Sequence, residues 1–317
     1  MTARSILDRT GTLVGLILVA AIFGALVGRQ FFAPANLELM ARQTAIVCMA
    51  ALGMTVVIAA GGIDLSVGSI IALTTVVIAL ALRADRAPLV AAAAGVAAAA
   101  ACGLVNGVLI TRLRVVPFIV TLGTMLVVRG AAKGLAEERR IEAPITWLND
   151  LLRSETGRLL VPPGIWTLLV VALLIGGLLG YTRLGRHVFA IGSNERMARL
   201  CGVAIDRTKI VVYTLGAALA GMAGLLQFSK LSVGDPTVAI GLELDVIAAV
   251  IIGGGSLSGG RGTVAGTIIG AAIMTVIQIG CSQKGLANWV QQIVTGGIIV
   301  VAVAIDRWRH SQREDVE

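Results

Sequence analysis

Long, uninterrupted blocks of apolar residues limit the folds open to this chain more than any other feature. A helix that crosses the hydrocarbon core of a bilayer needs about 20 mostly apolar residues. Ten segments approach that length, near residues 11–28, 43–60, 66–82, 88–110, 116–135, 164–181, 209–228, 243–255, 263–282 and 288–305. Only 14% of the 317 residues are charged, whereas soluble domains have about a quarter. The sequence therefore predicts an all-α integral membrane protein with about ten transmembrane helices, in which residues 1–317 form a single membrane domain.

Two glycine-rich motifs interrupt the apolar pattern. The first, Gly61 to Ser69, reads GGIDLSVGS, and the second, Gly253 to Gly260, reads GGGSLSGG. When Gly61–Gly68 is aligned with Gly253–Gly260, five of the eight positions match. The neighbouring segments 66–82 and 243–255 are short, so we expect broken or re-entrant helices at both motifs. Paired interruptions in two halves of a chain are typical of the binding pathway of a transporter.

Asp64 in the first motif has no Lys or Arg within fifteen residues on either side. Burying an unpaired carboxylate in hydrocarbon is costly, and irregular backbone survives at membrane depth only inside protein or beside water. In one interpretation, Gly61 and Gly62 end one helix and Asp64 and Ser66 cap the next. In a second, compatible interpretation, the break borders a polar pathway and helps to gate it. The predicted pathway residues are Gly61, Gly62, Asp64, Ser66, Ser69, Asn106, Thr121, Gly254, Ser256 and Ser258.

The basic residues indicate an orientation. Ten spans place both termini on the same side, and the segment 182–209 contains Arg183, Arg186, Arg196, Arg199, Arg207 and Lys209. Because cytoplasmic loops carry an excess of Lys and Arg, we expect cytoplasmic termini, a cytoplasmic loop at 182–209 and an external loop at 136–163. Most basic residues lie at the ends of apolar runs without interleaved aromatic residues. The net charge of +8 therefore indicates a lipid bilayer as the partner, and no nucleic acid.

The sequence offers no pattern for catalysis or for metal binding. The cysteines, Cys48, Cys102, Cys201 and Cys281, have no C-x-x-C spacing, and both histidines lie beside basic residues. The dipeptide Gly-Lys does not occur, so the chain lacks the phosphate-binding loop G-x-x-x-x-G-K-[ST]. H-E-x-x-H and G-x-S-x-G are also absent. We therefore expect a protein that is no enzyme, with no catalytic residue, no metal and no directly bound cofactor.

A short helix is predicted in the basic segment SNERMARLCGV. Ser193 or Asn194 provides an N-cap, Glu195 lies in the first turn, and Gly202 ends the helix. From the residues alone, this helix is either a solvated amphipathic linker or a docking element for another protein.

Four stretches together resemble one protein family. GGIDLSVGSIIAL resembles the signature of permease subunits of ribose- and xylose-type ABC importers. The other three are VPFIVTLGTMLVVRG, RLGRHVFAIGSNERMARLCGVAIDRTKI and LDVIAAVIIGGGSLSGGRGTVAGTIIGA. Their order and spacing resemble the family from about residue 35 to residue 305.

This resemblance implies a multi-pass permease of the bacterial inner (cytoplasmic) membrane that pairs with a second permease copy or a paralogue. Cytoplasmic ABC ATPase subunits would hydrolyse the ATP, and an extracytoplasmic sugar-binding protein would deliver a monosaccharide such as ribose. By the same resemblance, the predicted short helix couples the permease to the ATPase. The predicted coupling residues are Ser193, Asn194, Glu195, Ala198, Arg199 and Gly202.

Two other kinds of transporter remain open at this point. One is the related branched-chain amino-acid type of ABC permease, which the motif GGIDLSVGS fits less well. The other is an ion-coupled secondary transporter in which Asp64 is the coupling carboxylate. The sequence leaves the sugar undefined, and ribose, xylose, arabinose, galactose and related polyols are all compatible with it.

Overall fold

The computed structural model describes residues 3–152 and 161–314, and this part of the chain is almost entirely helical. The first half contains α1 (Ala3–Val27), α2 (Pro34–Ala59), α3 (Val67–Arg83), α4 (Pro88–Leu113), α5 (Pro117–Leu135) and α6 (Pro163–Tyr181). The second half contains α7 (Arg183–Ser193), α8 (Glu195–Leu200), α9 (Ile205–Leu231), α10 (Leu242–Ile252), α11 (Val264–Gln283) and α12 (Asn288–Glu314). The predicted all-α class is confirmed.

Each of the ten apolar segments coincides with a helix, and α7 and α8 lie in the basic segment between the sixth and the seventh. Within the described residues, six helices are long and apolar enough to cross a membrane, namely α2, α4, α5, α6, α9 and α11. Shorter apolar stretches lie at Gly11–Val27, Val67–Arg83 and Asn288–Val301. Four of the long helices, α2, α4, α5 and α6, have proline at their first position, where the missing N–H costs no helical hydrogen bond.

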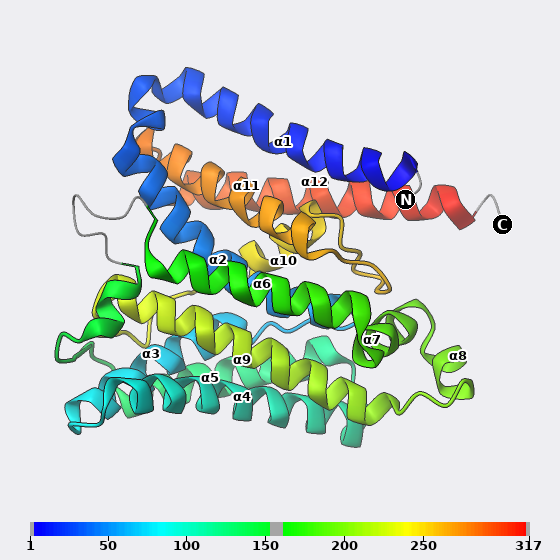
Figure 1. Ribbon diagram of the computed structural model, residues 1–317, viewed down its shortest axis with the longest axis horizontal. Coiled ribbons are helices and arrows are strands. Elements are labelled where there is room, and N and C mark those ends of the chain that lie inside the picture. Colours follow the sequence, from blue (N-terminus) through cyan, green and yellow to red (C-terminus); the bar gives the residue numbers. More distant parts are fainter. Residues whose placement is uncertain (1–2, 153–160, 315–317) are drawn as a thin grey trace.

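The long helices form a bundle in which α2 occupies the centre (Figure 1). One side is made of α1, α11 and α12, the other of α3, α4, α5 and α9, and α2 packs against helices of both sides. Every residue from 45 to 60 is buried. Most of α5, in contrast, exposes apolar side chains such as Leu126 and Val127. Because the outer helices present apolar side chains outward, the bundle suits a surrounding of lipid or of further protein.

The two ends of the bundle differ. The helices α7 and α8 project from one end, where the beginning of α1 and the end of α12 also lie (Figure 1). At the opposite end, β1 (Ile141–Glu142) pairs antiparallel with β2 (Val233–Gly234), with Ile141 opposite Gly234. The segment 136–152, predicted as part of an external polar loop, is therefore folded against the bundle, and Leu148 in the 3-10 helix η2 (Trp147–Leu151) is fully buried. The rest of that predicted loop includes residues 153–160, which lie outside the described residues.

Both glycine motifs break the helical backbone, as predicted. Gly61 and Gly254 have φ angles of 77° and 89°, a region that side-chain-bearing residues avoid. The first break follows a long helix, since the 26 residues of α2 span about 39 Å. The second follows a short one, since the 11 residues of α10 span about 16 Å, roughly half the hydrocarbon thickness. The 3-10 helix η1 (Arg29–Phe32) connects α1 to α2.

Candidate functional site

Three of the predicted pathway residues meet in the interior beside the first break. Asp64, Ser66 and Asn106 are each exposed by 1% or less. One carboxylate oxygen of Asp64, Oδ1, accepts hydrogen bonds from the Ser66 backbone N–H at 2.9 Å and from the Ser66 hydroxyl at 2.5 Å. The Ser66 hydroxyl in turn accepts a hydrogen bond from Asn106 Nδ2 at 2.9 Å. This network joins the first motif to α4, and we call these three residues the Asp64 cluster.

The predicted capping role is wrong for Ser66, whereas Asp64 accepts the Ser66 N–H directly before α3 begins. Ser66 occupies the N-cap position of α3, but its side chain makes no capping hydrogen bond. Its φ and ψ of −77° and −6° are already helical, whereas a capping side chain needs an extended backbone. Asp64 instead accepts the Ser66 N–H two residues on, a local turn that aspartate commonly forms. The polar groups are therefore directed to one another and to α4.

Two further helices hold the first break in place. Thr121 of α5, a predicted pathway residue, donates from its hydroxyl to the Ile63 carbonyl at 3.2 Å. Tyr213 of α9 is 2% exposed, and its hydroxyl lies where a Cβ at Gly62 would be placed. The absence of a side chain at Gly62 leaves room for this aromatic side chain. The sequence reasoning missed Tyr213, and its position as a tyrosine inside an apolar helix was the available signal.

Several polar atoms near the first break have no protein partner. Asp64 Oδ2, Asn106 Oδ1 and Ser69 Oγ are buried and make no hydrogen bond to any described residue. Leaving a buried polar atom unsatisfied costs about 1–3 kcal/mol. These atoms can therefore bind water or the hydroxyl groups of a polar solute.

The second motif is less buried than the Asp64 cluster. Ser256 is buried, whereas Gly254 and Ser258 are exposed. The second motif contacts the end of α2 just before the first motif, because the Gly260 N–H donates to the Ala59 carbonyl at 3.0 Å. The predicted pathway residues therefore fall into an interior group beside α3 and a group around the second break.

The predicted short helix is present as α8, and Asn194 rather than Ser193 is its cap. Asn194 Oδ1 accepts a hydrogen bond from the Met197 N–H at 3.0 Å, while Ser193 is the last residue of α7. Gly202 follows α8 with a φ of 81°. The local structure that was predicted from Asn194, Glu195 and Gly202 is confirmed.

The remaining residues of α8 divide between the protein and the solvent. Ala198 is buried against Ile191 of α7 and Ile205 of α9. Glu195 accepts a hydrogen bond from Lys209 at 2.7 Å and lies 3.4 Å from Arg199. The apolar side chains of Met197 and Leu200 are 55% and 80% exposed. The sequence reasoning missed this exposed pair, which lies three residues apart and so on one face of the helix.

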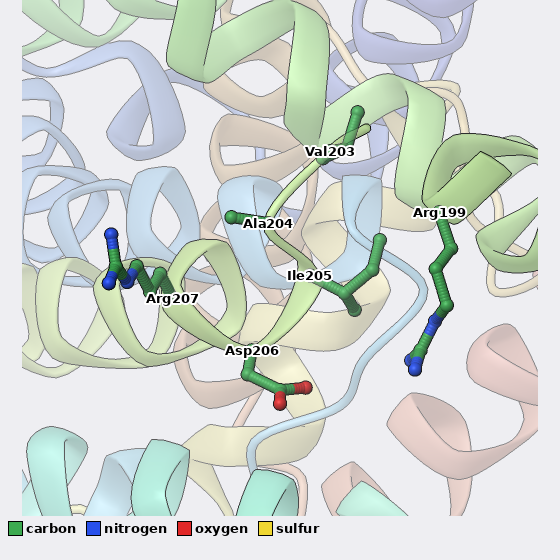
Figure 2. Close-up of a pocket in the computed structure, with 6 residues that line it drawn as sticks. All are labelled: Arg199, Val203, Ala204, Ile205, Asp206 and Arg207. Atoms are coloured by element: carbon green, nitrogen blue, oxygen red, sulfur yellow. The ribbon is translucent and has the colours of Figure 1, made fainter. Parts of the chain in front are cut away.

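A pocket lies at the turn between α8 and α9. It has a volume of about 260 Å³ and is lined by Arg199, Val203, Ala204, Ile205, Asp206 and Arg207. Figure 2 shows the side chains of Arg199 and Asp206 extending to the same side of the turn and Arg207 pointing away from both. Arginine pairs well with carboxylates of a protein partner. This mixed-charge surface is distant in sequence from the Asp64 cluster.

At the opposite end of the bundle, Asp235 fixes the loop after α9. Its carboxylate accepts hydrogen bonds from the Thr237 N–H at 2.8 Å, the Thr237 hydroxyl at 2.6 Å and Arg140 Nε at 2.9 Å. Burial raises the pKa of Asp235, but these hydrogen bonds and the Arg140 charge outweigh it, so the pKa lies below its ordinary value. Arg129 of α5 donates to the carbonyls of Pro236 and Val238 at 3.0 and 2.7 Å.

Metal-ligating groups are scarce in the described part of the chain. No group of three or more His, Cys, Asp or Glu side chains that could hold a metal ion occurs among those residues. The four cysteines are free thiols.

Comparison with known proteins gives a consistent result over nearly the whole chain. Residues 36–303 match the family model described as branched-chain amino acid transport system / permease component. The chain is 40% identical over 297 residues to the ribose import permease protein of Escherichia coli (strain K12), covering 93% of this chain and 92% of that protein.

Other relatives are similar over comparable lengths. The ribose import permease protein of Bacillus subtilis (strain 168) is 37% identical, with 95% of this chain and 94% of that protein covered. The L-arabinose ABC transporter permease protein of Azospirillum brasilense is 36% identical, with 97% and 90% covered. No solved structure matches the chain at a significant level.

Proposed function

The chain belongs to the family of branched-chain amino acid transport system permease components, and from this premise we propose that it is the permease subunit of an ABC importer for a monosaccharide. It is a multi-pass protein of the inner membrane. The relatives that carry the argument are import permeases for ribose and L-arabinose, and others are named for D-allose and fructose. A sugar is therefore the substrate class.

The polar groups of the interior support a sugar over an amino acid. An amino acid brings an ammonium and a carboxylate, which need charged partners when they are buried. A monosaccharide brings uncharged hydroxyls. The Asp64 cluster offers one carboxylate, one hydroxyl and one amide, with acceptors of Asp64 and Asn106 still open, and it contains no cationic side chain that could pair with the carboxylate of an amino acid. The chain therefore shares its family with branched-chain amino acid permeases, but we propose that it carries a different substrate.

We place the sugar pathway beside the two helix breaks. The single observation that carries this placement is the Asp64 cluster, a buried hydrogen-bonded network inside otherwise apolar helices. Broken backbone at membrane depth is tolerated where it borders a pathway or is packed in protein. In this proposal Asp64, Ser66, Ser69, Asn106 and Thr121 shape the interior part of the pathway. The group Gly254, Ser256 and Ser258 belongs to its cytoplasmic part.

The proposed topology has ten spans and cytoplasmic termini. It is supported by the ten helices that coincide with the apolar segments, and by the start of α1 and the end of α12, which lie at the same end of the bundle as α7 and α8 (Figure 1). The basic residues of segment 182–209 favour the cytoplasm for that end. Residues 1–2 and 315–317, the outermost part of both termini, lie outside the described residues.

Energy would come from partner chains. The sequence lacks the Gly-Lys of a phosphate-binding loop, so ATP would be hydrolysed by a separate cytoplasmic ATPase subunit. We assign its docking to α8, where Met197 and Leu200 expose apolar surface next to Arg199. Exposed apolar side chains beside a basic rim are typical of a protein interface. An external sugar-binding protein and a second permease subunit complete the proposed assembly.

Reconstitution tests this function. The permease is placed in liposomes with its cognate ATPase and sugar-binding protein, and uptake of labelled ribose, L-arabinose, D-allose and fructose is measured. We expect ATP-dependent uptake of at least one sugar that persists when ionophores remove all ion gradients. Uptake that stops with the ionophores while ATP remains would favour an ion-coupled transporter using Asp64. Uptake of leucine but of no sugar would overturn the substrate class.

A further inference from the structure

Three segments that are distant in sequence meet where α7 ends. They are the end of α2 with Gly61, the last turn of α7 with Gly192, and the second motif with Gly259 and Gly260. The Gly260 N–H donates to the Ala59 carbonyl at 3.0 Å and so joins the two broken segments directly. The four residues Gly61, Gly192, Gly259 and Gly260 are called here the glycine junction.

Gly192 is required at this place by contact and not by backbone conformation. It lies inside α7, so alanine would suit its helical backbone better than glycine does. A Cβ at Gly192, however, would overlap the Ala59 carbonyl oxygen and the Gly260 nitrogen. Both are backbone atoms, which cannot rotate away as a side chain does. Helix α7 therefore lies against the backbone of both breaks with no side chain between them.

The contact also includes Gly259. A Cβ at Gly259 would lie 2.6 Å from the Gly192 carbonyl oxygen and 2.9 Å from the Cα atoms of Gly192 and Gly61. All three segments are therefore in mutual contact. Because the contacts are between backbone atoms, a displacement of any one segment must displace the other two or open a gap between them.

On its other side, Gly192 is tied closely to α8. Only Asn194 separates α7 from α8, and its N–H donates to Ala190 at 3.0 Å. Ile191, Ala198 and Ile205 pack together across α7, α8 and the start of α9. The ion pair between Glu195 and Lys209 at 2.7 Å closes this unit. The segment from Gly192 to Lys209 is thus a compact body that carries the glycine junction at one edge.

We propose that the glycine junction passes movement of α8 to both helix breaks at once, with Gly192 as the positioning residue. The inference rests on the proposed function, in which α8 docks on the ATPase. Asp64 follows Gly61 by three residues and Ser256 precedes Gly259 by three. A shift of α7 therefore reaches both parts of the proposed pathway over a few residues of backbone. The two breaks open and close together because they share one contact.

The variant Gly192→Ala tests this role in the complete transporter. The added methyl group pushes α7 away from Ala59 and Gly260, so we expect the sugar imported per ATP hydrolysed to fall at least tenfold. Co-purification of the ATPase and basal ATP hydrolysis should stay within twofold of wild type, because the docking side chains of α8 are unchanged. The stimulation of hydrolysis by sugar-loaded binding protein should be lost.

Gly177→Ala is the matched control. Gly177 is also helical, in α6, but a Cβ there would meet no atom within 4 Å. This variant should keep the wild-type ratio of sugar to ATP. An unchanged ratio in Gly192→Ala would overturn the inference. If the wild-type complex neither binds the ATPase nor imports sugar with ATP, the proposed function itself fails.

Hydrogen exchange on the wild-type permease gives a second test that needs no variant. When the ATPase binds and then exchanges ADP for ATP, peptides covering residues 190–201 should change protection. We expect peptides covering 58–63 and 257–262 to change with them by at least threefold, since Gly260 donates the hydrogen bond that joins the breaks. The α4–α5 connection at 113–117 serves as the control. Changes confined to 190–201 would refute the inference, even if Gly192→Ala failed to fold.

Discussion

At the scale of single residues, the most informative feature of the interior is the set of hydrogen bonds made by the buried carboxylate of Asp64. Asp64 receives two hydrogen bonds from Ser66 on Oδ1, and Ser66 receives one from Asn106. Its second oxygen, Oδ2, bonds to no described residue. The hydrogen bonds that are formed join the first break to α4. In our proposal this network is also the part of the bundle where the sugar meets groups that can bind it.

We predict that Asp64→Ala lowers sugar uptake at least tenfold and destabilises the permease by about 1–3 kcal/mol, because Ser66 loses its buried acceptor. Uptake in proteoliposomes and thermal unfolding in detergent measure the two effects. Asp64→Asn is the matched control, since its amide oxygen can still accept from Ser66. Full uptake by Asp64→Ala would confine Asp64 to a structural role.

Asp235 gives the protein a predictable response to acid. Its folded-state pKa lies below its unfolded value, so its contribution is fully present above the unfolded pKa of about 3.9. The contribution is lost as the pH falls through the lowered folded-state pKa. We predict that Asp235→Asn unfolds at a lower temperature than wild type at pH 7. The difference should shrink steadily below about pH 4. A difference that stays constant from pH 7 to pH 3 would contradict this assignment.

At the scale of helices, the sequence predicted which segments form helices better than it predicted contacts between residues far apart in the chain. All ten apolar segments contain helices, and they could be predicted because a long apolar run is itself the signal for such a helix. The helix α8 followed from Asn194 and Gly202, whose effects are local. The capping role of Ser66 failed because its partner, Asn106, lies 40 residues away. The same limit applies to Arg129, whose acceptors Pro236 and Val238 are more than 100 residues distant.

The cap of α8 can be tested separately from its docking surface. Asn194→Ala removes the acceptor for the Met197 N–H, which costs about 1 kcal/mol for a typical cap. Because α8 has only six residues, we predict that it frays and that co-purification of the ATPase falls about fivefold, as that free energy implies. Asn194→Asp should retain binding, since aspartate caps equally well. Equal loss in both variants would assign Asn194 to direct contact with the partner.

At the scale of the whole molecule, the two ends of the bundle have different chemistry, and we propose that this difference sets the orientation in the membrane. Exposed Cys201 follows α8 at the basic end, and exposed Arg139 lies in the segment that precedes β1 at the other end. We predict that a membrane-impermeant thiol reagent labels Cys201 in inside-out vesicles and not in right-side-out vesicles. Arg139→Cys in a Cys201→Ser background should show the opposite pattern. If both positions react from the same side, the bundle cannot cross the bilayer in the proposed way. The proposed sugar pathway, which uses the polar network, the glycine junction and α8, would then have to be abandoned.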